Sequence, residues 1–353
     1  FGNDLSPFGD SNKIDINSID KNGKTILHSS CESGNFDLVK FILSLDKIDI
    51  NSKCKYYHSN FYYYMKNFEY YNKDDKMRYE SENSFEEKTA LHLAIEKNNI
   101  EIVRILITNS NIDVNSRFFS NYEKYDSNSG WMKIQTTVEK TGLQIAIEDD
   151  NIEIAKLLLS NDKIDVNSKF ILIEKYFSRK DKCDWEKTLE KTALHISIEK
   201  KNDEIIRNLL IKDSIDVNIK YLKTSVSSEG KDKEIEEKDA LYMAIDNNIN
   251  IDIVTLLLSK PKINVNTKYL YQRDDHTNSH GCGKKIEIPA LYLAFQCNKC
   301  EIVEHLLLMK NIYVNDKYNF DEYGYRSDNM SSSPLHLAVK NKNIKITGCP
   351  VKF

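Results

Sequence analysis

Cysteine and histidine side chains before residue 301 have the spacing of a zinc site. Cys297 and Cys300 are separated by two residues, and His276, His280 and Cys282 precede them. Thiolate and imidazole groups are preferred zinc ligands, and four of them close a structural site. However, the pair falls in an expected turn between two helices, whereas the other three lie near the tip of an insertion, at least a helix length of ~15 Å away. We therefore expect structural cysteines and no metal site. An enzyme built around Cys297 ranks third among the functional hypotheses.

Four histidines occupy the same place in a recurring segment, which could suggest catalysis: His28, His92, His195 and His336. The other three segments carry Gln144, Tyr242 and Tyr292 there. Catalysis needs converging groups, and a ladder of equivalent positions does not converge. The sequence also contains no Gly-rich phosphate loop, G-x-S-x-G or H-E-x-x-H pattern. We therefore predict no catalytic residue, no cofactor-binding residue and no enzymatic activity.

These positions belong to segments that each predict two helices. The four residues at the start of the first helix are called the helix entry of each segment. They are TILH (25–28), TALH (89–92), TGLQ (141–144), TALH (192–195), DALY (239–242), PALY (289–292) and SPLH (333–336). In residues 88–115, Thr89 can cap a first helix, Asn98 and Asn99 can end it, and Ile100 begins a second apolar helix. We expect helix pairs near residues 25–45, 89–110, 141–161, 192–213, 239–260, 289–310 and 333–346, the last of them partial.

The segments resemble ankyrin repeats. Residues 20–28, DKNGKTILH, follow the D-x-x-G-x-T-P-L-H pattern of that family. The four-residue motif after the second helix is called the exit phrase. Here the exit phrase is Ile-Asp-Val-Asn, as in Ile112–Asn115, where the family has Gly-Ala-Asp-Val-Asn. The resemblance covers roughly Asp20 to Ile346 apart from insertions, and it implies a hydrogen-bonding structural role for the histidines. The abundance of Asn, Lys and Ile resembles the large ankyrin families of AT-rich protist genomes. We expect one domain over residues 1–353, an all-α repeat solenoid with a helix-turn-helix stack and elongated β-hairpin fingers.

The fingers are the insertions that lengthen this repeat. Successive entries lie 44 to 64 residues apart, against about 33 in the family. The surplus lies between each exit phrase and the next helix, in residues 52–88, 116–140, 168–191, 219–238, 267–288 and 316–332. Aromatic and β-branched arms around turn-rich centres predict hairpins, and neighbouring hairpins could pair into a projecting sheet. The longest insertion could instead hide a degenerate repeat. Its aromatic residues Phe61, Tyr62, Tyr63 and Tyr64, together with Trp131 and Trp185, are candidate protein contacts. The aromatic residues of this insertion could instead pack onto neighbouring fingers or the flank of the solenoid.

Two columns of charge recur at fixed positions. Lysine precedes the helix entry at Lys24, Lys88, Lys140, Lys191 and Lys238, and an acidic residue follows eight positions later at Glu32, Glu96, Glu148, Glu199 and Asp246. In the ankyrin family both positions face the concave binding side. One interpretation is a solvated ladder in which Lys and Glu of neighbouring repeats pair weakly. The other is an electrostatic guide for a protein partner.

Composition limits the remaining classes of function. Fifty Lys and Arg against 54 Asp and Glu give a net charge of −4, so the chain has no global basic field for nucleic acid. No apolar run approaches the length of about 20 residues that spans a bilayer. Seven scattered cysteines fit a reducing compartment, so we expect the cytoplasm or the nucleus.

Because residues 13–17 match an exit phrase without its helices, we expect a fragment or processed product. We predict a monomeric, noncatalytic scaffold for unidentified protein partners. The alternative is a nucleic-acid or membrane-surface adaptor that uses aromatic and Lys-bearing fingers.

Overall fold

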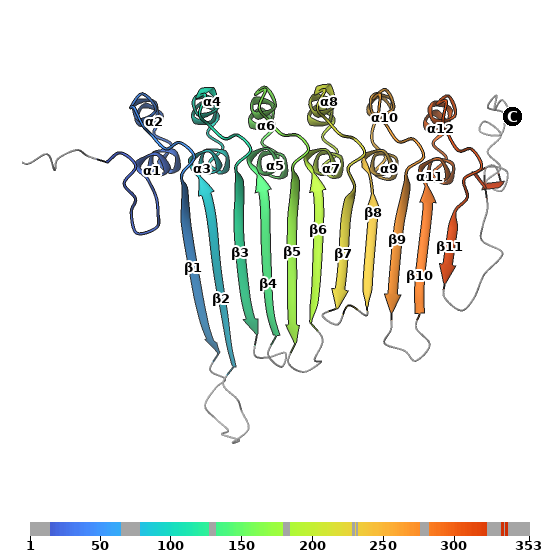
Figure 1. Cartoon of the computed structure of the whole chain (residues 1–353), viewed down its shortest axis with the longest axis horizontal. Helices are drawn as coiled ribbons and strands as arrows, with labels where there is room; N and C mark the ends of the chain where they lie inside the picture. The colour runs from blue at the N-terminus through green and yellow to red at the C-terminus, as the bar shows by residue number, and fades with distance from the viewer. Residues whose placement is uncertain are drawn as a thin grey trace, which may run out of the picture.

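The chain folds into a row of helix pairs with a broad sheet projecting from it. The computed structural model describes residues 15–64, 78–126, 132–178, 184–227, 230, 232–275, 282–322, 333–334 and 336–337. Over these residues the chain forms twelve helices and one sheet of eleven strands. The helices stand side by side in two rows, and the strands extend away from them in chain order (Figure 1).

The first helix of each pair lies nearer the sheet and is called the inner helix. The inner helices are α1 (Ile26–Ser33), α3 (Ala90–Glu96), α5 (Gly142–Glu148), α7 (Ala193–Glu199), α9 (Ala240–Asp246) and α11 (Ala290–Gln296). The outer helices are α2 (Phe36–Leu43), α4 (Ile100–Thr108), α6 (Ile152–Leu159), α8 (Asp203–Ile211), α10 (Ile251–Leu258) and α12 (Cys300–Leu307). Of the seventh predicted pair, residues 333–334 and 336–337 are described. The rest of that prediction lies outside the described residues.

Local sequence explains where the helices begin and end. Thr89 caps α3, and Asn99 caps α4 by accepting the N–H of Ile102 at 3.0 Å. Between the two helices the backbone turns through the left-handed region at Asn98, with a φ of 51°. Gly34, with a φ of 73°, makes the same turn in the first pair. The predicted helix breakers therefore occupy the turn positions.

The core lies between the two rows of helices. One leucine of each inner helix is at most 2 % exposed: Leu27, Leu91, Leu143, Leu194, Leu241 and Leu291. Each inner helix packs on the inner helix of the next repeat, and the outer helices do the same. Each repeat thus buries its apolar faces mainly against its neighbours, which makes stability a sum over adjacent units.

The insertions form the strands of the sheet. The strands are β1 (Lys53–Tyr64), β2 (Arg78–Thr89), β3 (Arg117–Asp126), β4 (Met132–Thr141), β5 (Lys169–Ser178), β6 (Trp185–Thr192), β7 (Tyr221–Ser227), β8 (Lys233–Lys238), β9 (Lys268–Asp275), β10 (Cys282–Pro289) and β11 (Asn319–Glu322). Each strand pairs antiparallel with the next, both within a finger and between fingers, as in β2 with β3. The expected pairing of fingers is confirmed. The all-α class is wrong, because the fingers are long enough to form a sheet as extensive as the helical stack.

The longest insertion also forms a hairpin in its described part. β1 and β2 pair from Lys53 opposite Thr89 to Tyr64 opposite Arg78. These residues are therefore strand and not a degenerate helical repeat. Residues 65–77 between the two strands lie outside the described residues.

The exit phrases are joined by a ladder of asparagine side chains. Asn167 donates from Nδ2 to the carbonyl of Ser214 at 2.7 Å and accepts the N–H of Asp216 at 2.9 Å. The same two bonds link each exit phrase to the following one at Asn17, Asn51, Asn115, Asn218 and Asn266. The recurrent Asn at the end of each segment is therefore a connector between repeats.

Candidate functional site

His28, His92 and His195 of the recurring entry are buried structural groups, whereas His336 is exposed. In the third helix, the N–H of Thr89 donates to Nδ1 of His92 at 3.1 Å, and Nε2 donates to the carbonyl of Ser116 at 3.0 Å. His28 makes the same contacts with Thr25 and Ser52. The bond from the backbone to Nδ1 requires a neutral ring with its proton on Nε2. His28 and His92 thus each tie a helix entry to the start of the following finger.

Gln144 replaces histidine without changing this arrangement. Its Oε1 accepts the N–H of Thr141 at 2.9 Å, and its Nε2 donates to the carbonyl of Ser168 at 2.7 Å. An amide therefore performs the same connection as the imidazole. His28, His92 and Gln144 lie in separate repeats, and each contacts the backbone of its own finger. They therefore do not converge into a catalytic arrangement.

Burial keeps the imidazole rings neutral. Desolvation lowers the pKa of His92 and that of His195 to about 3, and it also lowers the pKa of His28. The carbonyl of Ser116 partly opposes this shift at His92, because it accepts from the ring. The Nε2 of His195 is buried and has no hydrogen-bond partner among the described residues. His28, His92 and His195 are therefore sites of acid sensitivity in the helical stack.

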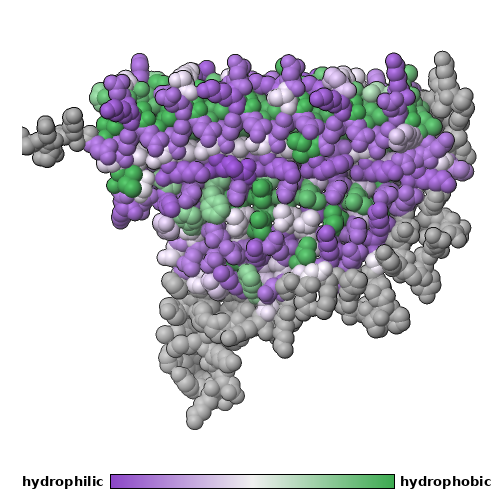
Figure 2. All heavy atoms as spheres, viewed as in Figure 1, coloured by the Kyte–Doolittle hydropathy of each residue, from purple (hydrophilic) through white to green (hydrophobic). Residues whose placement is uncertain are grey.

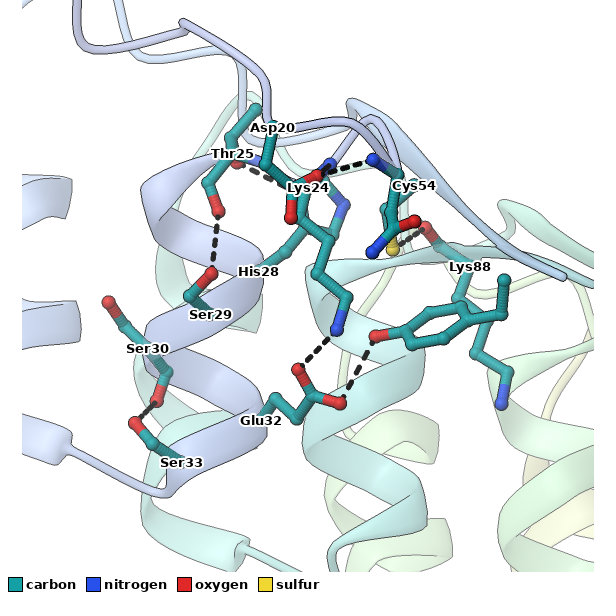
Figure 3. A network of polar contacts seen from close by, with 12 residues as sticks. Asp20, Lys24, Thr25, His28, Ser29, Ser30, Glu32, Ser33, Cys54 and Lys88 are labelled. Atoms are coloured by element: carbon teal, nitrogen blue, oxygen red, sulfur yellow. Dashed lines mark hydrogen bonds and ion pairs between the residues drawn. The ribbon is translucent and has the colours of Figure 1, made fainter.

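The charge columns consist of ion pairs within single repeats. Lys24 Nζ lies 2.7 Å from Glu32, as Figure 3 shows. The equivalent distances are 2.9 Å for Lys88 with Glu96, 2.9 Å for Lys140 with Glu148 and 3.0 Å for Lys191 with Glu199. The expectation of pairing between neighbouring repeats is therefore mostly wrong. The exception is Lys191, which also lies 3.7 Å from Glu148. The last column position differs, since Lys238 pairs with Glu236 at 3.3 Å.

The lysines of this column also lie over aromatic rings. Lys191 Nζ is 5.0 Å from the ring centre of Phe170, its partner across the hairpin, and Lys238 is 4.8 Å from that of Tyr221. Lys88 is partly buried. Its desolvation is outweighed by hydrogen bonds to Glu86 and Glu96, which raise its pKa. The lysines are thus held in place by a carboxylate and a ring, and they are not free surface charges.

The sheet has two faces that can be named from their residues. The Lys face carries Lys88, Lys140, Lys191 and Lys238, and it adjoins the acidic ends of the inner helices. The back face carries the residues one position earlier, Glu87, Glu139, Glu190 and Glu237, because successive strand residues point to opposite faces.

A patch of apolar and aromatic side chains lies at the centre of the Lys face, on β4, β5 and β6. Cross-strand register aligns Val138, Leu172 and Leu189 in one row and Ile134, Tyr176 and Trp185 in another. We call these six residues the central patch, and all of them are half-buried. Glu174 and Lys187 lie between the rows. Tyr176 donates its hydroxyl to Glu174 at 2.9 Å, and Lys187 lies 4.8 Å from the Tyr176 ring centre.

The back face is a paired surface of charge that sequence reasoning missed. Arg117 lies 3.0 Å from Glu139, and Lys169 lies 2.6 Å from Glu190. The charged back face could have been found in the sequence from the recurring tripeptide Glu-Lys-Thr at 87–89, 139–141 and 190–192, in which Glu and Lys face opposite sides of the sheet.

Figure 2 shows hydrophobic side chains of the sheet interrupted by hydrophilic ones, below a hydrophilic band at the junction with the helices.

The remaining predicted contacts are not brought together. Phe61, Tyr62, Tyr63 and Tyr64 lie on the distal part of β1, while Trp185 lies on β6, several strands away. Trp131 lies outside the described residues. Sequence reasoning missed Tyr176, because its place beside Trp185 depends on strand register.

The cysteine spacing does not assemble a metal site among the described residues. Cys297 ends α11 and Cys300 begins α12, while Cys282 begins β10 in a finger. His276 and His280 lie outside the described residues. The described part of the chain contains no group of three or more His, Cys, Asp or Glu that could hold a metal ion.

The family of the chain follows from its sequence matches together with this architecture. The family described as ankyrin repeats (3 copies) matches residues 54–170, 125–221 and 170–269, and the family described as ankyrin repeat matches residues 22–52. These matches cover more than half of the chain. The protein belongs to the ankyrin repeat family.

The ankyrin assignment fits the inner and outer helices and the projecting fingers. No curated protein matches the sequence significantly. None of the helices in the described part of the chain is long and apolar enough to cross a membrane. Ankyrin repeats are typical protein-interaction modules, so the surfaces of the helices and fingers are the places to seek function.

Proposed function

We propose that this ankyrin repeat chain is a single-domain, noncatalytic scaffold that binds protein partners on its Lys face. The observation that carries the proposal is the central patch, where Tyr176 and Trp185 lie side by side with aliphatic rows and charged neighbours. Partly exposed aromatic residues within a charged rim have the composition of protein-binding hot spots. The pairs Lys140–Glu148 and Lys191–Glu199 border the patch on the side of the helices. They would orient a partner of mixed charge.

We further propose that the chain is monomeric and resides in the cytoplasm or the nucleus. Cys31 and Cys54 are buried free thiols, and burial raises the pKa of Cys31 to about 12. Such thiols are unreactive and compatible with a reducing compartment. Sedimentation velocity of the purified chain tests the monomer, and fluorescence localisation in the source cells tests the compartment.

The central patch is tested by truncating one of two adjacent aromatic residues on opposite faces. Tyr176→Ala removes a ring from the Lys face, and Phe177→Ala removes one from the back face. Partners isolated from source-cell extracts with the wild-type chain are expected to bind Tyr176→Ala about tenfold or more weakly, because a central aromatic contact contributes about 1–2 kcal/mol or more. The measurement is the dissociation constant of each recovered partner by surface plasmon resonance.

The matched variant Phe177→Ala is expected to retain wild-type affinity. Thermal unfolding of both variants checks that each remains folded. The proposal that the Lys face is the binding surface would be contradicted if both substitutions lowered the affinity equally, or if Tyr176→Ala bound as tightly as wild type.

The charge column is tested by Glu96→Lys. Lys88 retains a partner in this variant, since Glu86 lies 2.7 Å from its Nζ. Partner association is expected to slow. The difference from wild type is expected to shrink between 50 and 500 mM salt, because the screening length falls from about 14 Å to about 4 Å over this range. Stopped-flow association rates provide the measurement. A rate difference that is independent of salt would argue against electrostatic guidance.

A further inference from the structure

In the part of the chain that the structure describes, the outer edge of β1 has no partner strand. The N–H of Lys55 points away from β2, because it donates to the carbonyl of Asn22 at 2.8 Å. In an antiparallel ladder alternate residues point the same way, so the backbone groups of Tyr57 and Ser59 also point outward. Among the described residues, no hydrogen bond crosses this edge beyond Lys55. The edge therefore presents a row of donors and acceptors that fits an extended peptide.

The edge is open because the neighbouring finger is short. Residues 18–24 form a loop in place of a long hairpin, and its Gly23 approaches the backbone of Lys53 and Cys54. Figure 1 shows this loop beside the upper part of β1, with the strand continuing well below it. Any repeat that preceded this one would be separated from β1 by the same short loop. Among the described residues, no strand therefore occupies the outer position beside β1.

An aromatic row on the back face ends at this edge. The ring centres of Tyr57 and Phe85 are 5.1 Å apart, and those of Phe85 and Phe119 are 6.0 Å apart. Lys55 Nζ lies 5.5 Å from the Phe85 ring centre. Tyr57 is 66 % exposed, and no described strand lies beside its ring across the edge. An added strand would place a side chain directly beside it, where aromatic and β-branched residues pair best.

We propose that the edge of β1 from Tyr57 onward is a docking site for an extended segment of a partner protein, which adds as a further strand and places an aromatic or β-branched residue opposite Tyr57. Main-chain hydrogen bonds would supply affinity and the Tyr57 pairing would supply selectivity. A second copy of the chain fits less well. Residues 53–60 carry Lys53 and Lys55 and no carboxylate, so two such edges would bring like charges together. This site is separate from the central patch.

The test uses a peptide probe and two substitutions at one position. The probe is a blocked, fluorescein-labelled peptide of alternating Thr and Val with a central Tyr and a Glu at each end. Ser59→Pro removes an outward N–H, whereas Ser59→Ala retains it. Proline is tolerated on edge strands, so the fold should persist. In fluorescence polarisation, Ser59→Ala is expected to match wild type and Ser59→Pro to bind at least tenfold more weakly.

Two further measurements keep the test independent of the folding of Ser59→Pro. N-methylation of alternate probe amides should abolish binding in one frame and spare it in the other. Hydrogen exchange of wild type with bound probe should slow in residues 57–64. The proposal is overturned if Ser59→Pro binds like wild type, if both methylated frames bind equally, or if protection falls on the central patch. Dimerisation that Ser59→Pro abolishes would assign the edge to a second copy instead.

Discussion

Replacing His92 and His195 together by glutamine is expected to reduce the loss of stability on acidification by several kcal/mol. Both rings are buried and neutral, and burial lowers each pKa from 6.5 to about 3. Protons therefore bind the unfolded chain first. The stability contributed by each neutral ring is complete above pH 6.5 and falls as the pH drops towards 3. At pH 4.5, two units below the unfolded pKa, the loss is about 2.7 kcal/mol per histidine.

Glutamine is the appropriate replacement because the chain already uses it in this position. Gln144 makes the hydrogen bonds to the helix entry and to the following finger without a titratable group. Urea unfolding at pH 7.5 and 4.5, followed by circular dichroism, measures the effect. The double variant should lose roughly 5 kcal/mol less than wild type between these two values. His58→Gln, at an exposed position on β1, serves as the control and should behave as wild type. An unchanged acid loss in the double variant would show that the rings are not the acid-sensitive groups.

Asn167→Ala is expected to weaken the connection between the two halves of the repeat array. The substitution removes the Nδ2 donor to the Ser214 carbonyl and the Oδ1 acceptor of the Asp216 N–H, which costs about 1–3 kcal/mol. Stability in a repeat array depends on interfaces between adjacent units. A weak central interface should therefore broaden or split the urea transition, and not only shift its midpoint.

Two companion variants isolate the role of this side chain. Asn167→Asp retains the acceptor but loses the donor, so it should also be destabilised. Asp162→Ala changes an exposed residue in the preceding loop and should stay within about 0.5 kcal/mol of wild type. If Asn167→Ala matches Asp162→Ala in stability and in the sharpness of unfolding, the ladder does not hold the repeats together.

The helical stack was predictable because its signals are local. Thr89 as a cap, Asn98 as a left-handed turn and the apolar spacing after Ile100 each depend on residues within one turn or two. The hairpin arms were also legible from their aromatic and β-branched content. The extent of the sheet was not, because pairing between fingers such as β2 and β3 depends on matched strand lengths and register. These are properties of two separate insertions.

The candidate site was harder to predict for the same reason. The Lys and Glu columns could be read from their spacing, but their pairing within one repeat depends on the angle between finger and inner helix. Trp185 was selected by residue type alone. The place of Tyr176 beside it, and of Leu172 beside Leu189, follows from strand register. The sequence therefore indicated the kinds of surface residue but not their grouping.

The hydrogen-bonded sheet has a mechanical consequence for the solenoid. A stack of helices alone can bend, because each repeat can rotate slightly relative to its neighbour. Here β1 to β11 tie the fingers edge to edge, so rocking of one repeat must shear or break strand pairing. We therefore expect the sheet to stiffen one side of the stack. A partner of the kind proposed would therefore meet a surface of fixed shape, and the array would not flex to accommodate one that fits poorly.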